Sequence, residues 1–352
     1  MLTIDIQKTL PDFNLDIQFS VANETVALLG PSGSGKTTAL HAIAGLIQPD
    51  SGRIALDQRV LFDAATKVNL RPQARRVGFV FHNYALFPHL TCAENVAFGL
   101  SLPNREARTA KTAEVMAQLH ISELGNRRPF QVSAGEQLLV ALARALATDP
   151  EILLLDDPFS ALDPTIRVRL ENELIAVKPH FKGPVILATR DLAEAYRLSS
   201  RIAVIETGGI RQIEEKNELL GRPKHRQTAI LTGVRNFFPG ELSETRPVCC
   251  MVKTMNRTLI AENDGYSFES GQAVLLGIRS EDVQLVPEGG DNVIAGTVTR
   301  VTEEIHSFTV IASVIGSPVQ IEVTLPKTAS IPKTGHHIWM YLPEDRIFLT
   351  LP

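Results

Sequence analysis

One octet in the sequence has residue types and a spacing that suit the binding of a nucleoside triphosphate. It matches the pattern G-x-x-x-x-G-K-[ST] at every fixed position and consists of Gly30, Pro31, Ser32, Gly33, Ser34, Gly35, Lys36 and Thr37. Glycines let a backbone curl until several N–H groups point at phosphate oxygens, and a helix that begins behind them adds its dipole. We expect Lys36 to reach the β- and γ-phosphates, Thr37 to ligate Mg²⁺ and Thr38 to join the nucleotide contacts.

Two adjacent carboxylates follow an apolar run later in the chain. Asp156 ends the run EILLLD at 151–156, and Asp157 comes next. In a nucleotide site, an acidic residue at the end of a neighbouring strand holds the metal. Asp156 is therefore predicted to hold Mg²⁺, and Asp157 to orient or deprotonate the attacking water. Taken alone, an acidic residue after a buried strand is also consistent with a helix cap.

The segments around these residues predict strands that alternate with helices. TVALLG at 25–30 is a short apolar run, and apolar residues at helical spacing follow Lys36, so the octet lies between a strand and a helix rather than in an ordinary turn. Further apolar strands are expected at 151–156, 184–189 and 201–205, with helices at 135–148 and 191–198. This alternation predicts an α/β fold with a parallel sheet.

The second part of the chain has the pattern of an all-β domain. Short β-branched runs at 273–278, 293–301, 308–314 and 319–323 are separated by Gly, Pro, Asn and Asp. We therefore predict two domains, a nucleotide-binding domain over 1–230 and a small β barrel or sandwich over 231–352.

Composition excludes several classes of protein. A net charge of −4 disfavours nucleic acid as a partner, and the three cysteines, two of them adjacent, do not form a disulfide framework. The first residues, MLTIDIQKTLPDF, do not resemble a signal peptide, and nowhere do eighteen apolar residues run consecutively. The chain is expected to be cytoplasmic and to reach a membrane only through other subunits.

Three motifs in order resemble the ATPase subunits of ABC transporters: the octet, VSAGEQLLVALARAL at 132–146, and ILLLDDPFSALD at 152–163. The resemblance implies a P-loop NTPase fold of the ABC type that binds and hydrolyses ATP. It also implies a head-to-tail homodimer in which Ser133 and Gly135 cap the γ-phosphate bound by the opposite subunit, while the loop 160–163 crosses between the two sites. By itself, a Ser-x-Gly before a helix would be an N-cap.

The segment GFVFHNYALFPHL at 78–90 resembles the loop that senses the γ-phosphate in this family. Its aromatic residues are otherwise consistent with a core, and the stretch 83–94 is expected to form much of a docking groove. The implied partners are two transmembrane permease subunits and a periplasmic or extracellular solute-binding protein. The implied location is the cytoplasmic face of the cell membrane.

Within the family, LTIDIQKTLPDFNLDIQF at 2–19 and TGVRNFFPGEL at 232–242 most resemble molybdate importer ATPases, and more distantly those for sulfate, iron, sugars and polyamines. GIRSEDVQLV at 277–286 and NVIAGTVTRV at 292–301 resemble the oligonucleotide-fold-like regulatory domain (TOBE or Mop type) of such importers. A β module without a ligand is an equal alternative. Ser280 and Ser307 are candidate oxyanion ligands there, and Phe13 is the candidate for stacking on adenine.

Four positions near the chemistry depart from the family pattern. His82 stands where the family has Gln, Asp157 where it has Glu, Arg190 where it has His, and Ala134 where it has Gly. Asp157 keeps a carboxylate on a shorter arm, while Arg190 cannot shuttle a proton but could clamp a phosphate. We expect ATP to bind well and hydrolysis to be slow, unless His82 and Arg190 substitute functionally.

Three functions follow as hypotheses. The first is an ATPase that drives oxyanion import, and the second is a nucleotide-dependent regulatory module with weak or no hydrolysis. The third is an importer ATPase for sulfate, iron or an organic solute.

Overall fold

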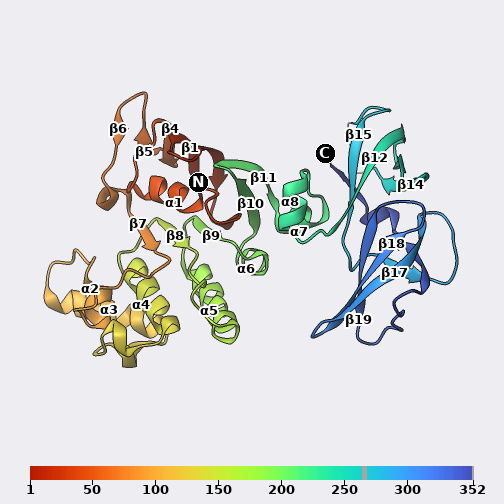
Figure 1. Cartoon of the computed structure of the whole chain (residues 1–352). Helices are drawn as coiled ribbons and strands as arrows, with labels where there is room; N and C mark the ends of the chain where they lie inside the picture. The colour runs from red at the N-terminus through yellow and green to blue at the C-terminus, as the bar shows by residue number, and fades with distance from the viewer. Residues whose placement is uncertain (264–267, 351–352) are drawn as a thin grey trace. The chain divides into compact units, whose positions relative to one another are not determined.

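The computed structural model describes residues 1–263 and 268–350 of the chain. They form two compact units, Met1–Lys216 and Asn217–Pro352 (Figure 1). The division lies 14 residues before the predicted boundary at 230, because two short helices, α7 (Lys216–Gly221) and α8 (Arg226–Leu231), precede the β strands of the second unit. Among the residues described, no helix is both long and apolar enough to cross a membrane.

The first unit contains a mixed sheet with the strand order β6-β5-β4-β1-β2-β11-β10-β3-β9-β8-β7. The strands are β1 (Leu2–Thr9), β2 (Asn14–Val21), β3 (Thr25–Leu29), β4 (Ser51–Leu56), β5 (Arg59–Asp63), β6 (Val68–Asn69), β7 (Val77–Val80), β8 (Ile152–Asp156), β9 (Val185–Thr189), β10 (Arg201–Glu206) and β11 (Gly209–Glu215). From β10 to β7 all neighbours pair in parallel. Every residue of β3, β8 and β9 is buried, as a parallel sheet covered on both faces requires.

The N-terminal hairpin of β1 and β2 was not among the predicted strands. Its two strands pair antiparallel, and buried residues alternate with exposed ones along both of them. This alternation is the signal for a strand with one buried face. The hairpin places Phe13, which lies in its turn, beside the phosphate loop.

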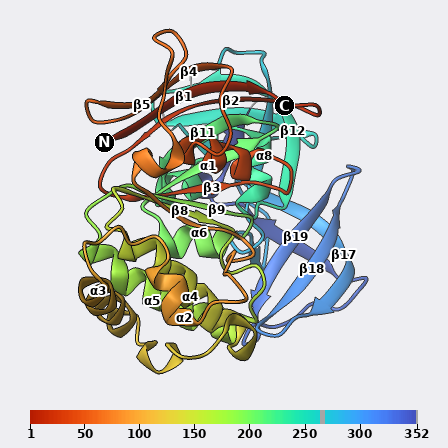
Figure 2. The ribbon, with the colours of Figure 1, turned by 90° about the vertical axis from the view of Figure 1, so that its left-hand side faces the viewer.

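Helices cover the parallel part of the sheet. They are α1 (Lys36–Ala44), α2 (Cys92–Ala97), α3 (Arg105–Gln118), α4 (Ala134–Ala147), α5 (Pro164–Val177) and α6 (Leu192–Leu198). Short 3-10 segments cover Pro72–Arg75, Ser122–Leu124, Pro129–Gln131, Lys178–His180 and Glu344–Arg346. The helices α2 to α5 gather on one side of β7 and β8 (Figures 1 and 2), and α4 is the centre of this group because most of its residues are buried.

The second unit is all β after its helices, as predicted. One five-stranded sheet has the order β14-β13-β12-β15-β21 and the other the order β16-β20-β17-β18-β19. The strands are β12 (Asn236–Thr245), β13 (Cys249–Thr254), β14 (Arg257–Glu262), β15 (Ala273–Ile278), β16 (Gln284–Val286), β17 (Val293–Glu303), β18 (Ser307–Val314), β19 (Gln320–Pro326), β20 (His337–Tyr341) and β21 (Phe348–Thr350). Side chains from both sheets form one shared core.

Candidate functional site: a nucleotide-binding cavity

The phosphate loop connects β3 to α1 with the backbone curl that its glycines permit. Gly33 has φ 79° and Gly35 has φ 103°, conformations that L side chains rarely adopt. At Gly30 a Cβ atom would lie 2.2 Å from the carbonyl oxygen of Ile205 on the neighbouring strand. The loop therefore requires glycine at these places, and the first turn of α1 presents its free N–H groups to the cavity.

Lys36 is held inside the loop. Its Nζ donates to Gly30 O at 2.8 Å, to Pro31 O at 2.7 Å and to Ser34 Oγ at 3.3 Å. Burial lowers the pKa of the Lys36 ammonium below its ordinary value, and the Asp157 carboxylate partly opposes that shift. A buried ammonium with only neutral hydrogen-bond acceptors around it is suited to an added anion such as a phosphate group.

Thr37 and Asp156 form the predicted metal-binding pair. The Thr37 hydroxyl donates to Asp156 Oδ1 at 2.9 Å, whereas Asp156 Oδ2 is buried without a hydrogen-bond partner in the described chain. Burial also raises the pKa of the Asp156 carboxyl group. A buried oxygen ligand that lacks a partner fits a hydrated Mg²⁺, which binds through one or two protein oxygens and retains waters.

Asp157 and Arg190 contact one another at the mouth of the cavity. Arg190 Nε donates to Asp157 Oδ2 at 2.9 Å, and a second guanidinium nitrogen, Nη1, donates to Ser32 Oγ at 3.2 Å. Asp157 has φ 45°, a left-handed conformation, and its N–H donates to Ala188 O on β9. Arg190 thus joins the carboxylate after β8 to the phosphate loop.

A cavity of about 410 Å³ brings most of the predicted residues together. It is lined by Phe13, Ser32, Gly33, Gly35, Lys36, Thr37, Thr38, His82, Asp156, Asp157, Ser160 and Arg190. Phe13 also packs against the adjacent core, so its ring both lines the cavity and contributes to the packing of the first unit. Ser160, at the start of the predicted crossing loop, is an additional lining residue.

Ser133 and Gly135 do not line this cavity. Ser133 is the N-cap of α4 and forms a capping box with Glu136: its Oγ accepts a hydrogen bond from the Glu136 N–H at 3.3 Å, and its own N–H donates to the Glu136 carboxylate at 2.7 Å. A Cβ atom at Gly135 would lie 2.9 Å from a methyl group of Ile166 and 3.0 Å from one of Leu170, so close packing of α4 on α5 favours a residue without a side chain there. Within one chain the signature residues therefore have structural roles.

His41 is a neighbour of the site that sequence reasoning missed. It lies on α1 and packs beside Phe79 and Phe81, with its buried Nε2 lacking a partner in the described residues. Burial lowers the pKa of His41, and the nearby Asp156 carboxylate partly opposes this shift. Its spacing of four residues from Thr37 places the two side chains on the same face of α1, which was the available signal.

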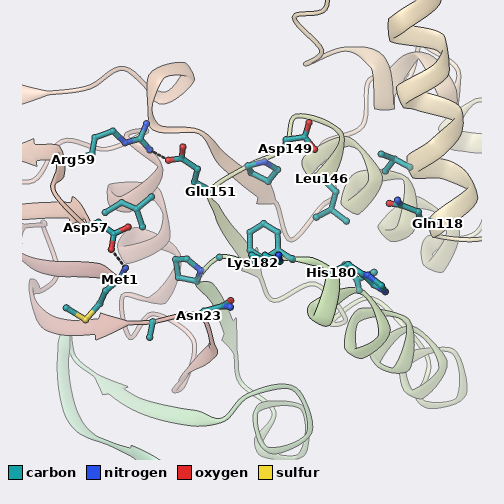
Figure 3. A pocket seen from close by; sticks show the side chains of 18 of the residues that line it. Met1, Asn23, Asp57, Arg59, Gln118, Leu146, Asp149, Glu151, His180 and Lys182 are labelled. Carbon is teal, nitrogen blue, oxygen red and sulfur yellow. Dashed lines mark hydrogen bonds and ion pairs between the residues drawn. The ribbon is translucent and has the colours of Figure 1, made fainter.

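A larger cavity of about 850 Å³ lies at the opposite ends of the parallel strands (Figure 3). Residues around it include Met1, Asp57, Arg59, Glu151 and Lys182. Arg59 pairs with Glu151, and the Met1 amino group pairs with Asp57. Four of its charged groups thus already partner one another, and none of the predicted phosphate-binding residues lines it.

A strand, phosphate loop and helix, with two carboxylates at the end of β8, a parallel strand of the same sheet, define a P-loop nucleotide-binding domain. Residues 12–160 match the family model described as "ABC transporter". The spermidine/putrescine import ATP-binding protein PotA of Methylococcus capsulatus is 40% identical over 301 residues, which are 83% of this chain and 74% of the relative. The chain belongs to the ABC transporter family and is an ABC-type ATPase, an importer ATP-binding subunit.

Other relatives have different cargoes in their names. The sulfate/thiosulfate import ATP-binding protein CysA of Synechocystis sp. is 36% identical over 92% of this chain and 82% of its own. The molybdenum import ATP-binding protein ModC of Mycobacterium tuberculosis is 39% identical over 66% of this chain and 65% of its own. A dimeric structure of the ATP-binding cassette MJ0796, bound to ADP and Pi, aligns with TM-score 0.53 and 28% identity over 61% of this chain and 99% of its own.

Proposed function

We propose that this chain binds Mg-ATP in the 410 Å³ cavity and uses its hydrolysis to drive import of a small solute. The observation that carries the proposal is the joint placement of Lys36, the Thr37–Asp156 pair and Asp157 in one cavity. Each of these groups would serve a different function in phosphoryl transfer: Lys36 neutralises charge, the Thr37–Asp156 pair binds the metal, and Asp157 orients water.

ATP binding follows from the buried groups of the loop. Lys36 and the N–H groups at the start of α1 attract the phosphates, and Phe13 offers a ring to the base. Thr37 and Asp156 would hold Mg²⁺, which supplies charge neutralisation to the phosphate oxygens when bound. These groups are all in place, so we expect tight nucleotide binding.

Hydrolysis depends on the altered residues. Asp157 would accept a proton from the attacking water, but one of its oxygens is already bonded to Arg190. Arg190 can orient this carboxylate and place positive charge near the γ-phosphate, although it cannot shuttle a proton. We therefore propose that turnover is slow relative to binding, with His82 at the cavity wall as the remaining group able to exchange a proton.

A homodimer would complete the site. Ser133 and Gly135 lie outside the cavity of their own chain, which supports the proposal that they serve the opposite subunit. The solved cassette MJ0796 is described as dimeric. In a head-to-tail homodimer, Ala134 would lie at both composite sites, so ATP hydrolysis would be affected equally at the two sites.

Permease docking is supported by a groove between α2 and α3. Its volume is about 540 Å³, and it is lined by Ala93, Glu94, Ala97, Arg105, Arg108, Thr109, Thr112, Ala113, Met116, Ser122 and Gly125. Beside it, Phe98 is 59% exposed and packs against Phe87, with the two rings tilted and their centroids 4.3 Å apart. We propose that a permease segment occupies this groove, which holds the chain at the cytoplasmic face of the membrane. A solute-binding protein would deliver cargo to the permeases.

For the cargo we propose an oxyanion such as molybdate or sulfate. The similarity to CysA extends over 92% of the chain and thus through much of the second unit, which we propose to be regulatory. The similarity to PotA favours a polyamine as the second candidate. Measuring the uptake of labelled molybdate, sulfate and spermidine distinguishes these cargoes, when cells that express this chain are compared with cells that lack it. Ser280, whose Oγ accepts a hydrogen bond from Thr324 Oγ1 at 2.9 Å, and Ser307, on β18, stay candidate ligands for an oxyanion in the second unit.

The decisive experiment is steady-state ATP hydrolysis by the chain with its permease subunits. We expect slow turnover that Lys36→Ala abolishes together with ATP binding, and faster turnover in Asp157→Glu and Arg190→His. Background turnover in the parent that rises in these two variants, with ATP binding intact, would instead support the regulatory module. Unchanged ATP binding in Lys36→Ala would contradict the proposed site.

A further inference from the structure

The loop after His82 contains a turn with an unfavourable backbone. Tyr84 has φ 59° and Ala85 has φ 46°, so two consecutive residues with side chains adopt the left-handed region. This region is sterically disfavoured for residues other than glycine and persists only where the surroundings enforce it. Beyond the turn, the loop is fixed independently, because the Asn95 side chain bonds Phe87, Leu90 and Thr91 through their backbone groups. The strain is therefore local to 84–85.

Arg144 on α4 is the group that holds this turn. One guanidinium nitrogen donates to Ala85 O and another to Tyr84 O, each at 2.7 Å. The guanidinium also lies 5.8 Å from the Phe87 ring centroid. No carboxylate forms an ion pair with Arg144 in the described chain, and burial lowers the pKa of its guanidinium below the ordinary value. The partly buried guanidinium of Arg144 thus donates hydrogen bonds to two carbonyl groups of a strained turn.

The turn also reaches the reacting end of the nucleotide cavity. The Tyr84 side chain is buried, and its hydroxyl donates to Pro158 O at 3.3 Å. Pro158 directly follows Asp157, and His82, at the other end of the turn, lines the cavity. A change at 84–85 would therefore move both the backbone beside Asp157 and the imidazole of His82.

We propose that Arg144 is a positioning residue for ATP hydrolysis: it holds the left-handed turn Tyr84–Ala85 and, through the Tyr84 hydroxyl, the backbone next to Asp157. The effect on hydrolysis rests on the function proposed above, whereas the hold on the turn does not. The planar fork of arginine can serve two neighbouring carbonyl groups together, which the point charge of lysine does poorly. Because α4 begins at the signature Ser133, this contact ties the signature helix to the catalytic carboxylate.

Fluorine NMR of the full chain labelled with fluorotyrosine tests the hold on the turn. The chain has four tyrosines, and the Tyr84→Phe variant assigns the resonance of Tyr84. We expect Arg144→Gln to shift or broaden this resonance. Adding Ala85→Gly should return it toward its parent position, because glycine adopts the left-handed turn without a Cβ penalty. Arg53→Gln is the matched control, since Arg53 is an exposed arginine on β4 that pairs with Asp63 at 3.8 Å, away from the turn.

Two results would overturn the proposal. The first is a Tyr84 resonance that is the same in Arg144→Gln as in the parent. The second is a resonance that moves but is not restored by Ala85→Gly, which would show that Arg144 does not act on the strain. If Arg144→Gln does not fold, Arg144→Lys replaces it, because the charge is kept and only the fork is lost.

Turnover with the permease subunits tests the effect on hydrolysis. We expect Arg144→Gln to lower kcat about tenfold and to change the KM for ATP by no more than about twofold. The reason is that the substitution would displace Asp157 slightly and leave the nucleotide-binding groups in place. We expect Ala85→Gly to restore kcat when it is added to Arg144→Gln. Such restoration would not follow if Arg144 only stabilised the fold. Equal loss of kcat in the control Arg53→Gln would contradict the proposal. A parent without turnover would overturn the proposed hydrolysis, while the NMR result would still decide whether Arg144 holds the turn.

Discussion

At the scale of single residues, the site combines groups that bind nucleotide with groups that restrain one another. Lys36 and Asp156 are buried and ready for new partners, whereas Asp157 is already engaged by Arg190. Arg190 in turn reaches Ser32, so one guanidinium spans the carboxylate and the phosphate loop. Removal of this contact is the reason why Arg190→His is expected to change turnover more than binding.

Glu194 makes stability depend on pH. It is 2% exposed, accepts a hydrogen bond from Thr189 Oγ1 at 2.9 Å, and has a second oxygen without a partner in the described chain. Burial raises its pKa to about 8, with a further increase from Asp157, Asp191 and Glu171, against the bond from Thr189. The folded state then binds the proton more tightly than the unfolded state, so this stabilisation is present at low pH and is lost as the pH rises through about 8.

We predict that Glu194→Gln flattens the decline of stability between pH 6 and 8, which for one such group amounts to at most about 1.4 kcal/mol per pH unit. Thermal unfolding of parent and variant across this range measures the effect. Glu123→Gln, at an exposed position, is the control. If stability falls with pH equally in Glu194→Gln and in the parent, Glu194 does not titrate in this way.

At the scale of elements, the C-terminus of the phosphate-loop helix depends on a buried arginine. Arg75 is fully buried and donates to Ala42 O and Ile43 O at 2.8 Å each, as well as to Leu70 O and the Asn69 side chain. Burial lowers its pKa to about 10, yet it stays charged near neutral pH. A cation at the C-terminus of α1 satisfies carbonyl groups that the helix itself leaves free.

We therefore predict that Arg75→Met destabilises the first unit by about 3 kcal/mol, because four acceptors lose their donor in a buried site. Denaturant unfolding measures the change. Arg59→Met is a useful comparison, since Arg59 is partly exposed and pairs with Glu151 at the surface. Losses of similar size in the two variants would mean that burial of Arg75 is not the cause.

At the scale of the whole molecule, the two units have separate cores. The first unit has two large groups of buried apolar residues on its sheet and helices, and the second has its own core between two β sheets. Each can in principle unfold cooperatively by itself, so a single transition is not expected.

The corresponding prediction is two thermal transitions, of which Mg-ATP raises only one. Ligand at about one hundred times its Kd adds about 2.7 kcal/mol to the stability of the unit that binds it. Calorimetry with and without Mg-ATP, repeated with Lys36→Ala, measures this. A shift of both transitions, or a shift that persists in Lys36→Ala, would contradict binding confined to the phosphate loop.

The sequence alone determined the phosphate loop, the fully buried parallel strands and four strands of the second unit, β15, β17, β18 and β19. These features depend on local spacing and on continuous apolar runs, which a sequence displays directly. Four of the eleven strands in the first sheet, β3, β8, β9 and β10, were predicted from continuous apolar runs. The other seven, which include the N-terminal hairpin, were missed because none of them is a continuous buried run: along β1 and β2, for example, buried residues alternate with exposed ones.

Only the tertiary structure decided which polar groups meet. The contacts of Arg190 with Ser32 and of Arg144 with the turn at 84–85 join residues 158 and about 60 positions apart. No local pattern encodes such distances, and the backbone strain at Tyr84 and Ala85 arises only from the surrounding packing. Short motifs thus indicate the type of chemistry. The contacts that restrain the reacting side chains form only when the sheet brings distant loops to one edge.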